Sequence, residues 1–182
     1  MATTAIIGDG PAGLSAALLL AKNGQRTIVY AQDDTLMHKA QLHNYLGIDD
    51  VSGTAFQGTA QRQARAVGAE LRDEAVESLG AEGDEFVLRT AESEQRADAV
   101  IVAGGRASRR LATGLGAQES DGAIVVDAEQ RTTVPGLYAA GHVVRPERSQ
   151  AIISAGAGAV AALDILSREA GKDVHDWDVP QG

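Results

Sequence analysis

A glycine-rich turn close to the start of the chain constrains its fold more than any other feature. Residues 5–7 form an apolar Ala-Ile-Ile run, and Gly8-Asp-Gly10-Pro-Ala-Gly13 follows directly. In such a turn the first glycine permits a tight bend, the second leaves room for a pyrophosphate, and the third lets a helix pack closely on a strand. The turn therefore predicts a dinucleotide site.

The segments that flank this turn have the composition of a βαβ unit. Residues 14–22 are rich in Ala and Leu and end at Asn23-Gly24, which is a helix C-cap signal. Residues 26–31 form a second apolar run at the interval that a βαβ unit requires. The helix would point its free N–H groups at the phosphates. Because the glycine signature does not recur, we expect one dinucleotide site in the chain.

Composition excludes several classes of function. A chain of 182 residues can bury one sizeable core but is short for two nucleotide-binding domains. Its net charge of -9 disfavours partners such as nucleic acid or an anionic membrane. The chain has no cysteine for a disulfide or a redox dithiol. The spacing of the histidines gives no metal signature, so no metal site is expected.

The sequence also carries no targeting signal that we recognise. Its first residues lack a basic region, and we expect no apolar run of membrane-spanning length. The simplest prediction is a cytoplasmic protein.

The pattern beyond the first βαβ unit predicts an α/β fold. Residues 54–68 have the composition of a helix that covers one face of a sheet, and residues 69–104 alternate between short strands and turns. We interpret the latter as a small antiparallel β-meander that returns the chain to a parallel sheet flanked by helices. The remaining segments are a Gly/Arg-rich linker over 104–116, strands over 124–127 and 137–141, and a long helix over 151–168.

Four segments together resemble the FAD-binding domain of thioredoxin reductase-like flavoproteins. They are residues 8–13; Asn44-Tyr-Leu-Gly47 with 51–53 and 63–70; residues 98–105; and residues 126–156, which include Val134-Pro-Gly-Leu-Tyr-Ala-Ala-Gly141. Their order and spacing match this family across nearly the whole chain. The resemblance implies FAD as the cofactor, a Rossmann-like FAD-binding fold, and oxidoreductase or electron-carrier activity.

The resemblance also implies which residues would contact FAD. In this family a helix after the last strand directs its N-terminus at the flavin N1/O2 edge, where negative charge develops on reduction. The residues that match cofactor positions are Gly8, Gly10, Pro11, Ala12, Gly13, Gln32, Thr35, Leu36, Asn44, Val76, Ala103, Gly104, Gly141, His142, Gln150, Ala151 and Ile152.

Two positions depart from the family pattern. His142 stands where an aspartate usually binds a ribityl hydroxyl, and an imidazole can still make that bond. Ala31-Gln32 stands where an acidic residue often binds the adenosine ribose, so Gln32 or Asp33 substitutes for it or the contact is lost. No catalytic residue is assigned, and the candidates are His43 and His142, as proton donors beside the flavin or in plain hydrogen-bonding roles.

A short bridge stands where the family has a whole domain. Thioredoxin reductases insert an NADPH-binding domain, which carries their redox CxxC, between the segments that match Gly105 and Ile124. Here only residues 106–123 fill that interval. We therefore expect a single FAD-binding domain over residues 1–171 and a C-terminal tail over 172–182.

Two functional interpretations follow from this pattern. In the first, the protein is a flavin oxidoreductase or electron carrier, a homodimer by analogy, whose FAD is reduced by an external redox protein or by NAD(P)H and passes electrons to an unidentified acceptor. In the second, it is a non-catalytic flavin-binding module or a subunit that needs a partner chain. Trp177, the only Trp, would anchor packing in this chain or on a dimer mate, or cover exposed flavin.

Overall fold

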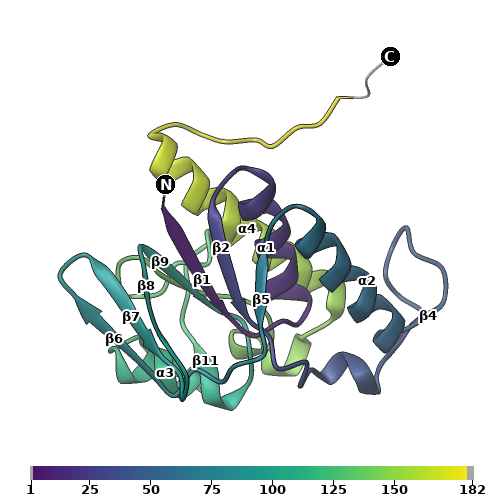
Figure 1. The fold of residues 1–182 in the computed structure, drawn as a ribbon. Helices are drawn as coiled ribbons and strands as arrows, with labels where there is room; N and C mark the ends of the chain where they lie inside the picture. Colours follow the sequence, from purple (N-terminus) through teal and green to yellow (C-terminus); the bar gives the residue numbers. More distant parts are fainter. Residues whose placement is uncertain (1, 180–182) are drawn as a thin grey trace.

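A five-stranded parallel sheet forms the centre of the computed structural model, which describes residues 2–179 (Figure 1). The strands lie in the order β12-β9-β1-β2-β5. Their bounds are β1 Thr3–Ile7, β2 Arg26–Tyr30, β5 Glu70–Arg72, β9 Ala99–Val102 and β12 Leu137–Ala139. The central strands β1 and β9 are buried along their whole length, as continuous apolar runs in a parallel sheet require.

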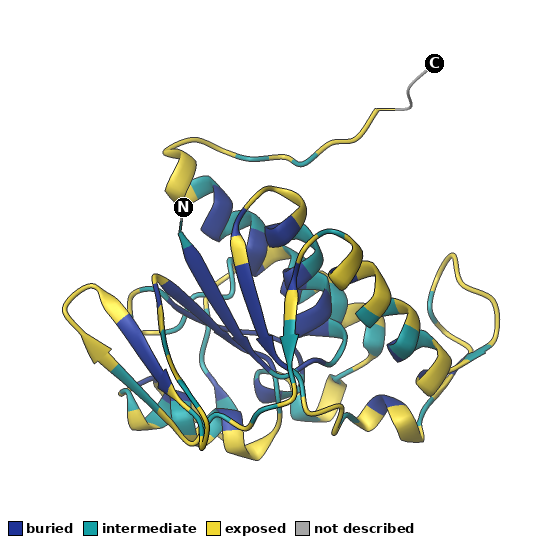
Figure 2. Cartoon of the chain, in the orientation of Figure 1, coloured by how far each residue is buried: buried dark blue, intermediate teal, exposed yellow. Residues whose placement is uncertain are grey.

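Three helices cover one face of this sheet. They are α1 (Pro11–Lys22), α2 (Gly53–Ala66) and α4 (Ala151–Ala170), and both α2 and α4 pack against α1. The core between helices and sheet holds Ile6, Val29 and Ile101 from the strands, together with small and branched residues of the helices. Figure 2 shows the buried sides of α1 and α4 turned toward the strands.

The opposite face of the sheet is covered by an antiparallel meander. Its strands are β6 (Ser78–Glu82), β7 (Glu85–Arg89) and β8 (Glu94–Ala97), paired in that order. Phe86 and Leu88 of β7 pack into the second core with residues of the parallel strands. The predicted α/β class, with a parallel sheet, flanking helices and a small meander, is confirmed.

Short elements connect these layers. They are the 3₁₀ turns η1 (Leu36–Lys39), η2 (Gly141–Val143) and η3 (Pro146–Arg148), the hairpin of β3 (Gln41–Leu42) with β4 (Val51–Ser52), helix α3 (Arg106–Gly114), and the hairpin of β10 (Glu119–Ser120) with β11 (Ala123–Ile124).

Three predicted segments differ in the structure. The strand expected over 124–127 is limited to β11, which pairs antiparallel with β10 outside the main sheet. Residues 70–72 were expected in the meander, but they pair parallel with β2 at the edge of the main sheet, where a half-polar strand is tolerated. The expected linker at 104–116 contains helix α3, whose buried residues Ser108 and Ala112 lie one turn apart on the same side. The Gly/Arg-rich composition of this segment favoured the prediction of a linker over that of a short amphipathic helix.

Helix α4 is small-residue-rich because it lies against the backbone of α1. A Cβ atom on Gly158 would come within 2.0 Å of the Ala12 carbonyl oxygen, so only glycine fits there. The small residues of α4 therefore permit a close approach between two helices.

By length and composition α4 would suffice to cross a membrane, with a mean hydropathy of 1.4, and it is the one such helix among residues 2–179. The expectation that no apolar run reaches this length is therefore wrong. Ala161, Ala162 and Ile165 of α4 are buried in the helix-side core. The packing of α4 on its neighbours thus explains the apolar residues on its buried side.

The C-terminal tail lies at the amino end of the sheet, the end at which the chain begins (Figure 1). Lys22, at the end of α1, forms an ion pair with Asp176 at 3.0 Å, and the Val174 N–H donates to Ser167 Oγ. Trp177 is 86% exposed. It therefore neither packs within this chain nor covers the glycine turn, which lies at the other end of α1.

A partly buried ion pair and a tyrosine hydrogen bond attach α4 to Arg131 and to β12. Asp164, whose side chain is 8% exposed, accepts hydrogen bonds from both arms of Arg131 and, at 2.6 Å, from the Tyr138 hydroxyl. Burial would raise the pKa of Asp164, but these donors outweigh burial and hold the pKa below its ordinary value. Burial and the Asp164 charge raise the pKa of Tyr138 to about 12.

This network predicts an acid-dependent loss of stability. Replacing Asp164 with Asn removes a charged acceptor and should lower the free energy of unfolding at pH 7 by about 1–3 kcal/mol. The pKa of Asp164 is lower in the folded state than its ordinary value of 3.8. The stabilisation by its carboxylate is therefore complete above the ordinary value and is lost as the pH falls through the folded-state pKa. Urea unfolding should show a smaller difference in stability between wild type and Asp164→Asn at pH 3 than at pH 7.

The control is Asp173→Asn, at an exposed tail residue for which the structure records no ion pair or hydrogen bond within residues 2–179. It should match wild type at both pH values. An Asp164→Asn protein as stable as wild type at pH 7 would contradict the assigned role.

Candidate functional site: a pocket at the carboxyl ends of the strands

The glycine turn adopts the geometry that its sequence predicts. Gly8 has a φ of +110°, and a Cβ there would come within 2.7 Å of the Gly104 backbone. A Cβ on Gly13 would lie 1.9 Å from the Gly8 carbonyl oxygen, so helix α1 packs directly on the turn. At Gly10 a Cβ would meet only Thr35 Oγ1, at 3.5 Å. Backbone packing thus requires glycine at positions 8 and 13, whereas Gly10 borders open space and its predicted role toward a pyrophosphate stays a prediction.

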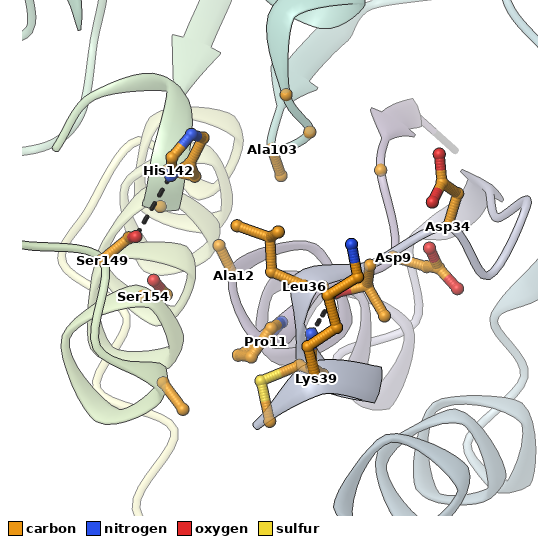
Figure 3. A pocket seen from close by; sticks show the side chains of 18 residues that line it. Asp9, Pro11, Ala12, Asp34, Leu36, Lys39, Ala103, His142, Ser149 and Ser154 are labelled. Carbon is orange, nitrogen blue, oxygen red and sulfur yellow. Dashed lines mark hydrogen bonds between the residues drawn. The ribbon is translucent and has the colours of Figure 1, made fainter. Parts of the chain in front are cut away.

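A pocket of about 320 Å³ opens beside this turn (Figure 3). Its walls come from four places that are far apart in the sequence: the turn after β1, the η1 segment after β2, the turn after β9, and the stretch from η2 to the first turn of α4. The first, third and fourth of these follow parallel strands directly. Ligands of open α/β sheets bind at this edge, outside the carboxyl ends of the strands.

Most of the predicted cofactor residues line this one pocket. They are Gly8, Gly10, Pro11, Ala12, Thr35, Leu36, Ala103, Gly104, Gly141, His142 and Ala151. Gly141 lies close to α1, because a Cβ on it would come within 2.9 Å of the Ala12 Cβ. The fold therefore gathers most of the residues that the resemblance picked out along the chain.

Six of the predicted residues do not line the pocket. They are Gly13, Gln32, Asn44, Val76, Gln150 and Ile152. Gly13 is buried behind the turn, and Gln32 is exposed. Asn44 donates a hydrogen bond to Gln150 Oε1 at 3.0 Å, which attaches the loop after β3 to the start of α4. These two side chains lie beside the pocket rather than in it.

The two candidate histidines are separated by the fold. His142 lines the pocket, and its Nδ1 lies 3.1 Å from Ser149 Oγ (Figure 3). His43 lies outside it, 69% exposed, with its Nδ1 3.2 Å from a carboxylate oxygen of Asp50. Of the two, His142 alone is placed to exchange a proton with a ligand in the pocket.

The structure adds residues that the motifs did not single out. They are Asp9, Asp34, Met37, Lys39, Gly105, Ser149 and Ser154. Asp9, Gly105, Ser149 and Ser154 lie inside the matched segments, so treating those segments as continuous stretches would have found them. Asp34, Met37 and Lys39 lie outside the matched segments, within three residues of Thr35 or Leu36.

Asp9 is the most buried polar group at the turn, with 4% of its surface exposed. Its carboxylate accepts a hydrogen bond from Gln61 of α2 at 3.0 Å, and its backbone oxygen accepts one from Gln57 at 2.7 Å. Burial raises the pKa of Asp9, and the Gln61 hydrogen bond opposes that rise. These contacts attach α2 to the turn.

Among residues 2–179, no group of three or more metal-binding side chains comes together. The polar atoms of the pocket are backbone amides, hydroxyls, two carboxyls, one imidazole and one ammonium. Such a set offers hydrogen-bond donors and acceptors to a polar organic ligand.

Comparison with known proteins agrees with this geometry. The sequence pattern of the pyridine nucleotide-disulphide oxidoreductases matches residues 48–159, which is more than half of the chain. The chain belongs to the pyridine nucleotide-disulphide oxidoreductase family. Within that family it corresponds to the FAD-binding domain and is thioredoxin reductase-like.

Individual relatives support the same assignment. The chain is 33% identical to a mercuric reductase of Acidithiobacillus ferrooxidans over 177 residues, which are 93% of this chain and 29% of that protein. It is 35% identical to a thioredoxin reductase of Streptomyces coelicolor over 112 residues, which are 58% of this chain and 35% of that one. The chain thus spans about a third or less of these relatives.

Solved structures share its fold at low sequence identity. An atypical thioredoxin reductase of Desulfovibrio vulgaris Hildenborough superposes with a TM-score of 0.86 at 19% identity, covering 94% of this chain and 99% of that one. A ferredoxin-flavin thioredoxin reductase of Clostridium acetobutylicum gives a TM-score of 0.78 at 20% identity, covering 93% and 98%.

The packing of the turn predicts different effects for two glycine substitutions within helices. Gly13→Ala places a methyl group 1.9 Å from the Gly8 carbonyl oxygen, so the turn must shift, and the free energy of unfolding should fall by about 1–3 kcal/mol. Gly156→Ala meets nothing within 4 Å and should stabilise the protein by up to about 1 kcal/mol. Chemical denaturation of both variants checks the pair, and equal effects would contradict the packing argument.

Proposed function

We propose that the pocket binds FAD and that the protein is a flavin oxidoreductase or electron carrier supplied with electrons by a separate donor. The observation that carries the proposal is the pocket itself, which combines an open glycine turn at the start of α1 with a second helix N-terminus, that of α4. Two anionic parts of one elongated ligand fit this arrangement, a pyrophosphate and a reduced flavin ring.

The residues present fit the cofactor. Gly10 leaves space where a Cβ would stand, and Gly10 and Pro11 at the start of α1 would hold the pyrophosphate. His142, which lies across the pocket from Pro11 (Figure 3), would border the flavin ring together with Ala151 at the start of α4. When bound, FAD supplies the electron-transfer chemistry, and the protein supplies orientation and electrostatics.

The need for a separate donor rests on what lies between β9 and β12. In the described chain this interval holds α3, the β10–β11 hairpin and connecting loops, where the family resemblance implies a nicotinamide-binding domain. The sequence also has no cysteine to form a redox dithiol. Both observations support an electron donor, and any redox dithiol, outside this domain.

Spectroscopy tests the proposal directly. The purified or FAD-reconstituted protein should be yellow, and anaerobic stopped-flow mixing should bleach the flavin rapidly with at least one of NADPH, NADH and reduced ferredoxin. Bound FAD that none of these reduces would favour a non-catalytic flavin-binding module. A colourless protein that takes up no FAD would overturn the proposal.

His142 is the proposed proton donor at the reactive end. His142→Asn removes the titratable group from the pocket and should slow flavin reduction at least about tenfold, because positioned general acids contribute roughly 10²–10⁴-fold. His43→Asn is the matched control and should stay within about twofold of wild type, since His43 lies outside the pocket. Equal rates of flavin reduction in the two FAD-saturated variants would contradict the role of His142 as proton donor.

A further inference from the structure

The pocket carries more acidic groups than an anionic ligand would favour. Asp9 and Asp34 both line it, while Lys39 is the sole lysine or arginine among the described residues of its wall. Asp9 lies within the glycine turn itself, and α2 holds it there through Gln57 and Gln61. An ionised carboxylate at this position opposes the positive potential of the α1 N-terminus.

Two glutamine side chains of α2 surround Asp9. Gln57 is 1% exposed and donates its amide N–H to the Asp9 backbone oxygen at 2.7 Å and to the Asp9 carboxylate at 3.3 Å, while its own Oε1 has no hydrogen-bond partner among the described residues. Gln61 donates to Asp9 and also, at 3.0 Å, to Asp33. The side-chain amides of Gln57 and Gln61 thus already donate to oxygens of Asp9 and Asp33. A positive charge that balances a bound phosphate must therefore come from another part of the pocket.

The segment that carries Lys39 is fixed between the turn and α2. Thr35 Oγ1, at the start of η1, lies 3.5 Å from the place where a Gly10 Cβ would stand. At the other end the Gly53 N–H donates to the Ala40 oxygen at 2.8 Å, and a Cβ on Gly53 would collide with the Met37 oxygen. Lys39 therefore extends from a backbone that is packed on both sides.

The Lys39 side chain extends into the pocket across the first turn of α1, near Pro11 and Leu36 (Figure 3). The structure records no ion pair for its ammonium within 4.0 Å among residues 2–179. The other two lysines, Lys22 and Lys172, lie at the opposite end of the molecule, by the C-terminal tail. An ammonium on a flexible stem is a common ligand of phosphate groups.

We propose that Lys39 binds the pyrophosphate of the cofactor and offsets the carboxylates of Asp9 and Asp34. This inference rests on the proposed function, because it takes the diphosphate of FAD as the ligand. Lys39 is then a positioning and affinity residue for the cofactor, not a group that takes part in electron transfer. The glycine turn and the lysine would bind the diphosphate from two sides of the pocket.

Ligand truncation separates the pyrophosphate from the flavin ring. Lys39→Met should weaken FAD binding to the apoprotein roughly 10- to 100-fold, the loss expected for one charged hydrogen bond. It should weaken ADP binding by a similar factor, because ADP carries a diphosphate and adenosine but no flavin. FAD binding is measured by flavin fluorescence, and ADP binding by displacement of FAD.

Two further variants and one further measurement sharpen the test. Lys39→Arg keeps the charge and should retain most of the affinity, and Lys172→Met removes an exposed tail lysine and should behave as wild type. Raising the salt concentration should weaken FAD binding less in Lys39→Met than in wild type. The reduction potential of bound FAD should be unchanged in Lys39→Met, since the proposed contact is remote from the ring.

The outcomes are distinguishable. Equal losses for FAD and ADP support the pyrophosphate assignment. A loss for FAD without a loss for ADP, or a shifted reduction potential, would place Lys39 at the flavin ring and overturn the inference, as would unchanged binding of both ligands. A wild-type protein that binds no FAD would instead defeat the proposed function.

Discussion

The structure depends on backbone contact between three segments at the start of α1. Gly13 brings that helix against the turn after β1, and Gly158 brings α4 against the Ala12 carbonyl, in both cases closer than any Cβ would allow. These contacts direct the N-termini of α1 and α4 into the same pocket. The pocket therefore has two regions of positive potential, at a spacing set by glycine packing rather than by charged side chains.

The positive potential of the pocket thus arises from helix N-termini in a protein whose net charge is -9. Helix termini and backbone amides attract an anion without adding lysines or arginines, and only Lys39 supplements them in the pocket wall. Asp9, buried within the turn and bound by α2, weakens the same potential. The proposed role of Lys39 follows from this local balance of charge and not from any sequence motif.

Much of the architecture could be predicted because local rules decided it. Apolar runs separated by glycine and proline turns identified the parallel strands, and the glycine spacing identified the roles of Gly8 and Gly13. Prediction failed where partners are distant in sequence. Glu70–Arg72 joins the parallel sheet because β2 lies beside it, and α3 is a helix because its buried face meets the meander side of the sheet.

The sequence by itself determined that a strand, a glycine turn and a helix follow one another, since those preferences are encoded within one continuous segment. Only the tertiary structure decided which distant residues complete the pocket beside them. It placed His142 in the pocket and left His43 outside, and it brought Lys39 and Asp9 together there. The reason is physical: side chains far apart in sequence become neighbours only through the packing of helices on a sheet, which no local pattern specifies.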